Sequence, residues 1–178
     1  MDAWIDEGVD RSSFMWSKLV PNKCNIFMWR AFLDRLLTRM ALSRRNIMVD
    51  KLFCVWCETS DESIEHVRTG CRVSAGIRNA ITNWCWIPGM FVFHVKDLVE
   101  FHEHCGVSGI YKTVIHGIII IIACWRMWKA RNDKVFANKD TSVAETEADI
   151  KSLGFLWYKH RLKQGVVDWD RWIKFNLM

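Results

Sequence analysis

Four side chains of the kind that bind metal lie close together between residues 54 and 71. Cys54 and Cys57 form a C-x2-C pair, His66 follows after eight residues, and Cys71 comes after four more. Three thiolates and one imidazole are a standard tetrahedral ligand set for zinc, and four protein ligands leave no open position for water. The spacing therefore predicts one Zn2+ with a structural role. The alternative is a group of ordinary buried cysteines beside a surface histidine.

A second group of candidate ligands follows downstream: His94, His102, His104 and Cys105. If this segment is helical, His102 and His104 point about 200° apart around the helix axis. At most, weak metal binding is expected here.

The sequence shows no motif of an enzyme. It contains no G-x-x-x-x-G-K-[ST], no G-x-S-x-G and no H-E-x-x-H. Its clustered carboxylates surround the cysteines, where a solvated surface explains them: Glu58, Asp61, Glu62 and Glu65. No recognisable setting supplies the aspartates that a two-metal polymerase or nuclease needs. We expect no catalytic residue, and no enzyme activity from this chain on its own.

Basic residues gather just before the cysteines. Between residues 18 and 51, eight Lys or Arg stand against two Asp, in a chain whose net charge is +5. The acidic residues make the tip of the cysteine loop a poor surface for phosphate. If RNA or DNA binds, we expect its phosphates to meet a set of five arginines, and the alternative is a solvated helix face. These are Arg30, Arg35, Arg39, Arg44 and Arg45.

Composition indicates a folded intracellular protein. Apolar residues make up 51% of the 178 residues, and the seven cysteines are an odd number, unlike a secreted disulfide scaffold. Residues 1–10 are acidic and have no apolar run, so we expect no secretion signal and a nuclear or cytoplasmic location. Val114–Cys124 is strongly apolar but spans about half of the roughly 20 residues that a membrane helix needs. We expect a buried core helix there and no membrane contact.

Apolar residues recur at three- and four-residue spacing, which predicts a mainly α fold. It comprises a helix pair, the zinc knuckle loop and a C-terminal helical bundle, with room for one short strand or hairpin at residues 13–20. The expected domains are residues 1–90 and residues 91–178, the second packed on the first. The expected helices are Asn25–Leu37, Thr38–Arg45 with Thr38 as its cap, Arg72–Trp86, Val95–His104, Ile110–Phe136 and Val143–Lys163.

Several short motifs occur together. They are Pro21 and Lys23, Trp29-Arg30, Thr38-Arg39, Arg44 to Ile47, the Cys-Cys-His-Cys set, and the later stretch WRMWKARNDKVF. In this combination the chain resembles the zinc-binding domain of plant LINE-type (non-LTR) retrotransposon reverse transcriptases. In those polyproteins the domain follows the polymerase. The resemblance implies a C-terminal fragment of such a polyprotein, with residues 1–90 as the zinc-binding domain.

The resemblance also carries functional expectations. It implies a non-catalytic module that binds one zinc and associates with RNA or DNA and with the polymerase domain of the parent polyprotein. The alternative is a structural or protein-interaction module, or an inactive relic. The sequence departs from the family pattern at Leu37, where a proline is usual, and at Arg68 and Thr69, where aromatic and apolar residues are usual. The last two changes are expected to weaken the small core under the knuckle.

Overall fold

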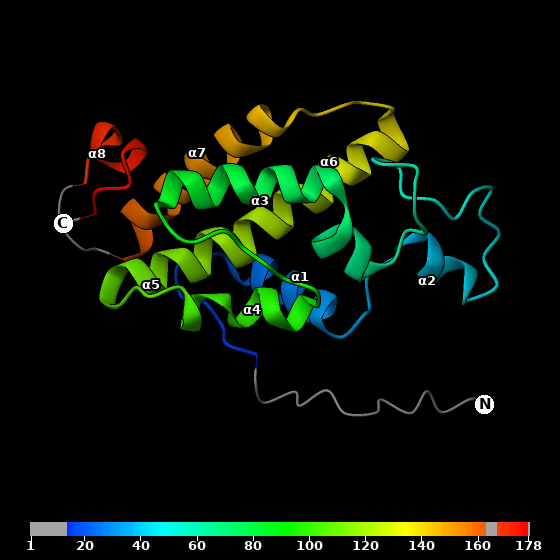
Figure 1. The fold of residues 1–178 in the computed structure, drawn as a ribbon, viewed down its shortest axis with the longest axis horizontal. Coiled ribbons are helices and arrows are strands. Elements are labelled where there is room, and N and C mark those ends of the chain that lie inside the picture. Colours follow the sequence, from blue (N-terminus) through cyan, green and yellow to red (C-terminus); the bar gives the residue numbers. More distant parts are fainter. Residues whose placement is uncertain (1–13, 163–166, 178) are drawn as a thin grey trace.

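A computed structural model describes residues 14–162 and 167–177, without the side chains of residues 119–121. The fold is mainly α-helical, as predicted (Figure 1). In chain order the helices are α1 (Asn22–Phe32), α2 (Arg39–Ser43), η2 (His66–Gly70), α3 (Arg72–Cys85), α4 (Val95–His104), α5 (Gly109–Ile115), η3 (His116–Ala123), α6 (Cys124–Ala137), α7 (Val143–Arg161) and α8 (Trp169–Ile173).

One long rod forms the centre of the molecule. Helices α5, η3 and α6 follow one another without a break from Gly109 to Ala137, where the sequence predicts a single helix. The middle part, η3, contacts α1, α3, α4 and α7. Ile115, Ile118 and Ile122 are completely buried there, because the rod is surrounded by other helices at this level. The apolar stretch is therefore core, as expected, and none of the described helices is long and apolar enough to cross a bilayer.

The first helix ends earlier than its apolar pattern predicts. α1 stops at Phe32, and Asp34 adopts a left-handed conformation with φ 48°. A left-handed residue breaks the hydrogen-bond ladder of a helix, so Leu36 and Leu37 lie outside it. Thr38 then caps α2 as predicted, because its Oγ1 accepts a hydrogen bond of 3.2 Å from the Ala41 N–H.

Residues 14–20 run beside α1 and form no strand. The Asn25 side chain takes the place of a partner strand: its Oδ1 accepts from the Ser17 N–H at 3.0 Å, and its Nδ2 donates to the Ser17 carbonyl at 3.0 Å. The predicted strand or hairpin is therefore absent over residues 14–20, and residue 13 lies outside the described part.

Two tryptophans fasten the end of the chain to the bundle. Trp172 of α8 is completely buried, and its indole N–H donates to the Lys151 carbonyl of α7 at 2.9 Å. Trp84 of α3 donates in the same way to the Ile173 carbonyl at 2.9 Å. A Cβ on Gly154 would lie 2.8 Å from the Trp172 ring, so the close approach of α8 to α7 needs glycine there. The core consequently draws on both halves of the sequence.

Candidate metal centre

A tight turn presents the first two cysteines. The loop folds back on itself through hydrogen bonds from the Cys54 N–H to the Ser60 carbonyl and from the Glu62 N–H to the Leu52 carbonyl, both 2.8 Å. Glu58 reverses the chain with a left-handed φ of 56° while its N–H donates to the Cys54 carbonyl at 3.0 Å. Both thiols therefore point to the same side of the loop.

A wide helical turn presents the other two ligands. η2 is a π-helix, in which each N–H bonds to the carbonyl five residues earlier. The Cys71 N–H donates to the His66 carbonyl at 2.7 Å, so these two residues lie one above the other. In an α-helix, residues five apart would point about 140° away from each other. The H-x4-C spacing thus fits a π turn.

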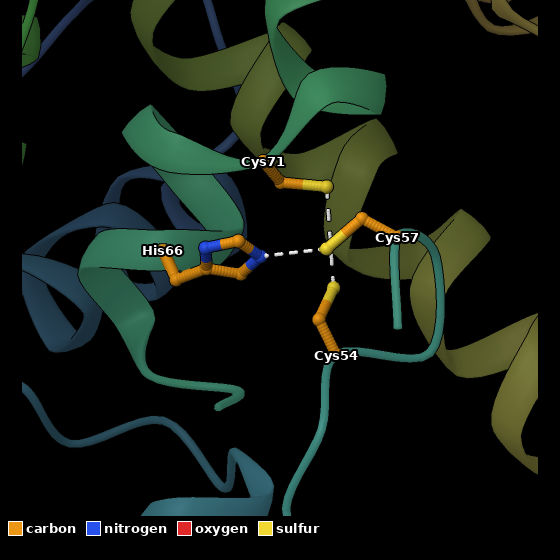
Figure 2. A group of neighbouring side chains, drawn as sticks. All are labelled: Cys54, Cys57, His66 and Cys71. Carbon is orange, nitrogen blue, oxygen red and sulfur yellow. Dashed lines mark hydrogen bonds between the residues drawn. The ribbon is translucent and has the colours of Figure 1, made fainter. Parts of the chain in front are cut away.

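The four ligand atoms converge on one point, as Figure 2 shows. They all lie within 4.8 Å of one another, with 3.9 Å between the sulfurs of Cys54 and Cys71 and 3.1 Å between Cys57 Sγ and His66 Nε2. A zinc–sulfur bond of about 2.3 Å places tetrahedral sulfurs about 3.8 Å apart. The donor set and its spacing therefore fit a single zinc ion bound by the chain alone.

Hydrogen bonds around Cys71 favour the thiolate form that binds a cation. A hydrogen bond from the Cys54 thiol is the main reason why the pKa of Cys71 falls to about 7, and the same bond raises the pKa of Cys54. Backbone N–H groups of Val73 and Ser74 also point at the Cys71 sulfur, because Cys71 is the N-cap of α3. Zinc binding requires the ligand thiols to lose their protons, and the lowered pKa of Cys71 favours this step.

Comparison with known proteins agrees with this geometry. Residues 5–77 match a family model described as zinc-binding in reverse transcriptase. This stretch is less than half of the chain and contains all four ligands. No curated protein and no solved structure matches the chain. The chain therefore carries a zinc-binding domain of the kind associated with reverse transcriptases, with one zinc site at Cys54, Cys57, His66 and Cys71.

A buried ion pair joins this zinc-binding domain to the central rod. Glu62 is completely buried and its carboxylate accepts from the guanidinium of Arg131 on α6, with 3.2 Å to Nε and a closer contact to Nη2. It also accepts from the Arg39 N–H at 3.0 Å, at the start of α2. Sequence reasoning missed both roles, because Glu62 looks like one more surface acid and Arg131 is far away in the chain.

The acidic surface of the knuckle is smaller than predicted. Glu62 is buried, and Glu65 is half-buried with Oε2 accepting from the Val95 N–H at 2.8 Å at the start of α4. Only Glu58 and Asp61 are exposed. The carboxylates of Glu62 and Glu65 therefore connect the loop to α2, α4 and α6 instead of facing solvent.

Arg68 and Thr69 occupy the small core in an unexpected way. Arg68 is completely buried, its guanidinium lies over the rings of Phe27 and Trp128 at 5.1 and 5.6 Å, and Nη1 donates to the Cys124 carbonyl at 2.6 Å. Its Nε and Nη2 have no partner among the described residues. Burial lowers the pKa of Arg68 to about 10. The Thr69 hydroxyl donates to the Glu65 carbonyl at 2.8 Å, and the Phe93 carbonyl also lies within reach of it, at 3.0 Å.

The five predicted arginines have different surroundings. Arg39 is half-buried and donates from Nη1 to the Phe53 carbonyl at 2.7 Å, so it also holds the knuckle loop. Arg44 pairs with Asp34 at 3.1 Å. Arg30, Arg35 and Arg45 are exposed.

The second candidate ligand group does not assemble. His102 is buried, and its ring stacks on that of His116 with 4.2 Å between centroids. His104 is exposed, so His102 and His104 point apart as expected. Among the described residues, only the group around Cys54 brings three or more such ligands together.

Proposed function

We propose that this chain is a nucleic-acid-associated module of a plant LINE-type retrotransposon reverse transcriptase, folded around one zinc and non-catalytic in isolation. The observation that carries the proposal is the closed Cys3His site, which lies inside the reverse transcriptase match and adjoins the basic segment. The module is located in the nucleus or the cytoplasm, where thiols stay reduced. All seven cysteines have free thiols, as such a location requires.

Bound zinc can fix the position of the basic residues through contacts within the chain. Bound zinc would supply a cross-link between the loop of Cys54 and the turn of His66. Glu62 and Arg39 then fasten α2 to this loop, through the Arg39 N–H and the Phe53 carbonyl. The exposed Arg35 and Arg45 are thereby held on a fixed backbone, and phosphates of RNA or DNA would meet them.

Two measurements test the proposal. Zinc content of the purified chain should be about one per molecule and should fall to near zero in Cys57→Ser, with Cys105→Ser outside the site as control. Binding to RNA and DNA should weaken with salt, and Arg35→Ala and Arg45→Ala should each reduce the salt slope by roughly one, whereas Lys174→Ala on the distant end of the bundle should not. Binding without salt dependence would contradict it.

A protein-interaction role is the second candidate. Three aromatic side chains between α3 and α4 are largely exposed: Trp86 by 84%, Phe91 by 90% and Phe93 by 77%. Exposed aromatic groups of this kind often mark protein contacts. On this alternative the loop would pack on the polymerase domain of the parent polyprotein, and a Phe91→Ala, Phe93→Ala double variant would lose that contact in a pull-down while keeping zinc binding.

A further inference from the structure

Three hollows adjoin along one side of α6. The first, of about 540 Å3, lies between α1 and α6. The second, of about 520 Å3, shares Leu37, Arg131 and Phe136 with the first. The third, of about 330 Å3, lies against the zinc knuckle and shares Arg39, Lys51 and Val135 with the second. Because neighbouring hollows share lining residues, the three lie in a row along α6, and together they are named here the α6 groove.

Aromatic rings are placed along the α6 groove. Trp125 lines it at the α1 end with the Lys23 ammonium 5.8 Å from the ring centroid. Trp128 lies deeper and is covered by the Arg131 guanidinium at 4.9 Å. Phe136 is 81% exposed where the first two hollows meet. Because Phe136 packs against so little of the protein, its ring is free to stack on a ligand.

Positive charge flanks these rings at both ends. Lys23 and Arg30 line the groove beside α1, while Arg39, Lys51 and Lys134 line it beside the knuckle. The Arg131 charge in between is balanced by Glu62. Opposing carboxylates in the lining are Asp50 and Glu58, and Lys134 also pairs at 2.9 Å with Asp140, which is 82% exposed on its side chain. The lining therefore carries a net positive charge.

We propose that the α6 groove binds single-stranded nucleic acid, with a base stacked on Phe136 and phosphates at Lys23, Arg30 and Lys51. This inference rests on the proposed function and adds that the nucleic acid is single-stranded and that it binds in the α6 groove. Basic grooves with interleaved aromatic rings bind single strands, since every base has a face to stack and only an unpaired strand can turn it toward a side chain. From Trp125 to Asn138 the groove follows α6 for about 20 Å, at 1.5 Å per residue.

Binding of labelled oligonucleotides by fluorescence anisotropy tests the inference on the whole zinc-loaded chain. RNA and DNA of one mixed sequence are compared as single strands and as duplexes, each of about 12 nucleotides, within the range of known single-strand sites. The Phe136→Ala variant should bind single strands roughly 5- to 150-fold more weakly, the loss expected for one stacked base. Phe136→Trp should restore binding and Phe136→Leu should not, which separates stacking from plain apolar contact.

The matched control is Phe91→Ala, because Phe91 is similarly exposed, by 90%, and lies between α3 and α4, away from the groove. Its affinity should equal that of the unaltered chain, and Lys51→Ala should lower the salt slope where Lys96→Ala on α4 does not. Equal affinity for duplex and single strand, or equal effects of the two phenylalanine variants, would overturn the inference while leaving salt-dependent binding through Arg35 and Arg45 intact. Absence of all nucleic-acid binding would overturn both proposals.

Discussion

At the scale of single residues, the Glu62 carboxylate joins three parts of the chain that are far apart in sequence. It accepts hydrogen bonds from the Arg39 N–H and from the Arg131 guanidinium, and the Glu62 and Arg131 side chains are almost fully buried. A buried pair of this kind adds little net stability, but removing one partner leaves the other charge without compensation. Replacing Glu62 should therefore destabilise the fold by much more than the ion pair itself stabilises it.

We expect Glu62→Ala to lower the free energy of unfolding by about 3–5 kcal/mol, because Arg131 would keep a buried charge without its carboxylate. Urea denaturation of the zinc-loaded chain measures this. Glu58→Ala, in the same loop and exposed, should change the stability by less than about 0.5 kcal/mol. Similar losses in the two variants would show that the pair has no special role.

Arg68 leads to the opposite prediction. Its guanidinium is buried with two nitrogens lacking partners among the described residues, and its one hydrogen bond goes to a neutral carbonyl. An apolar side chain of similar length keeps the packing on Phe27 and Trp128 without burying a charge. Arg68→Met should therefore raise the free energy of unfolding by about 1–3 kcal/mol, measured by urea denaturation. A less stable variant would mean that the two cation–π contacts outweigh the burial of the charge.

At the scale of elements, the π turn η2 decides whether His66 reaches the metal. A Cβ on Gly70 would lie 3.3 Å from Nδ1 of His66, which is tighter than an ordinary contact. Gly70→Ala should displace the imidazole by a few tenths of an ångström and weaken zinc affinity by roughly 10-fold, the lower end of the effects seen for groups that support metal ligands. Competition with a chromogenic chelator measures it.

Gly89→Ala serves as the control for this element. A Cβ on Gly89 would lie 3.6 Å from the Phe91 ring, an ordinary contact away from the ligands. Its zinc affinity should match that of the unaltered chain. If Gly70→Ala also kept full affinity, the turn would be flexible enough to reposition His66 without cost.

The elements also show what sequence can predict here. α4 has the bounds that its apolar period predicts, Val95–His104, and Thr38 caps α2 as its residue type suggests. The ligand set follows from spacing alone, because zinc needs four soft or borderline donors at short range. The early end of α1 does not follow, since the apolar spacing continues through Leu37 while the left-handed Asp34 ends the helix.

Contacts between distant segments set the limit of such prediction. Glu62 and Arg131 are 69 residues apart, and each resembles a surface residue within its own stretch. Arg68 likewise departs from an apolar pattern, yet the fold encloses it between Phe27 and Trp128. The α6 groove depends on the same long-range packing. Its rings and cations come from α1, the knuckle and α6, which only the folded chain brings together.

At the scale of the whole molecule, two stacked histidines make stability sensitive to acid. Burial lowers the pKa of His116 from 6.5 to about 4, and burial also lowers the pKa of His102. Between pH 6.5 and 4, His116 is therefore protonated in the unfolded chain but neutral in the folded chain. Its contribution to the free energy of unfolding is fully present above pH 6.5 and is lost as the pH falls toward 4. The loss from His116 should be on the order of 3 kcal/mol.

Urea denaturation at several pH values measures this loss. Because zinc ligands also take up protons in acid, the informative quantity is the difference between variants that share the same zinc site. His116→Gln should flatten the decline between pH 6.5 and 4, while the exposed His104→Gln should leave it unchanged. Parallel curves for all three chains would show that the histidine stack does not govern acid sensitivity.

The buried position of Trp172 has a consequence for folding during synthesis. Among the described residues this indole is the largest completely buried side chain, and it packs directly over Gly154 of α7. During synthesis the last zinc ligand, Cys71, emerges about a hundred residues before Trp172, so we expect the metal loop to fold while the opposite end of the bundle still lacks this side chain. Until α8 emerges, Trp84 and Tyr158 lack the Trp172 ring that packs against them in the folded chain.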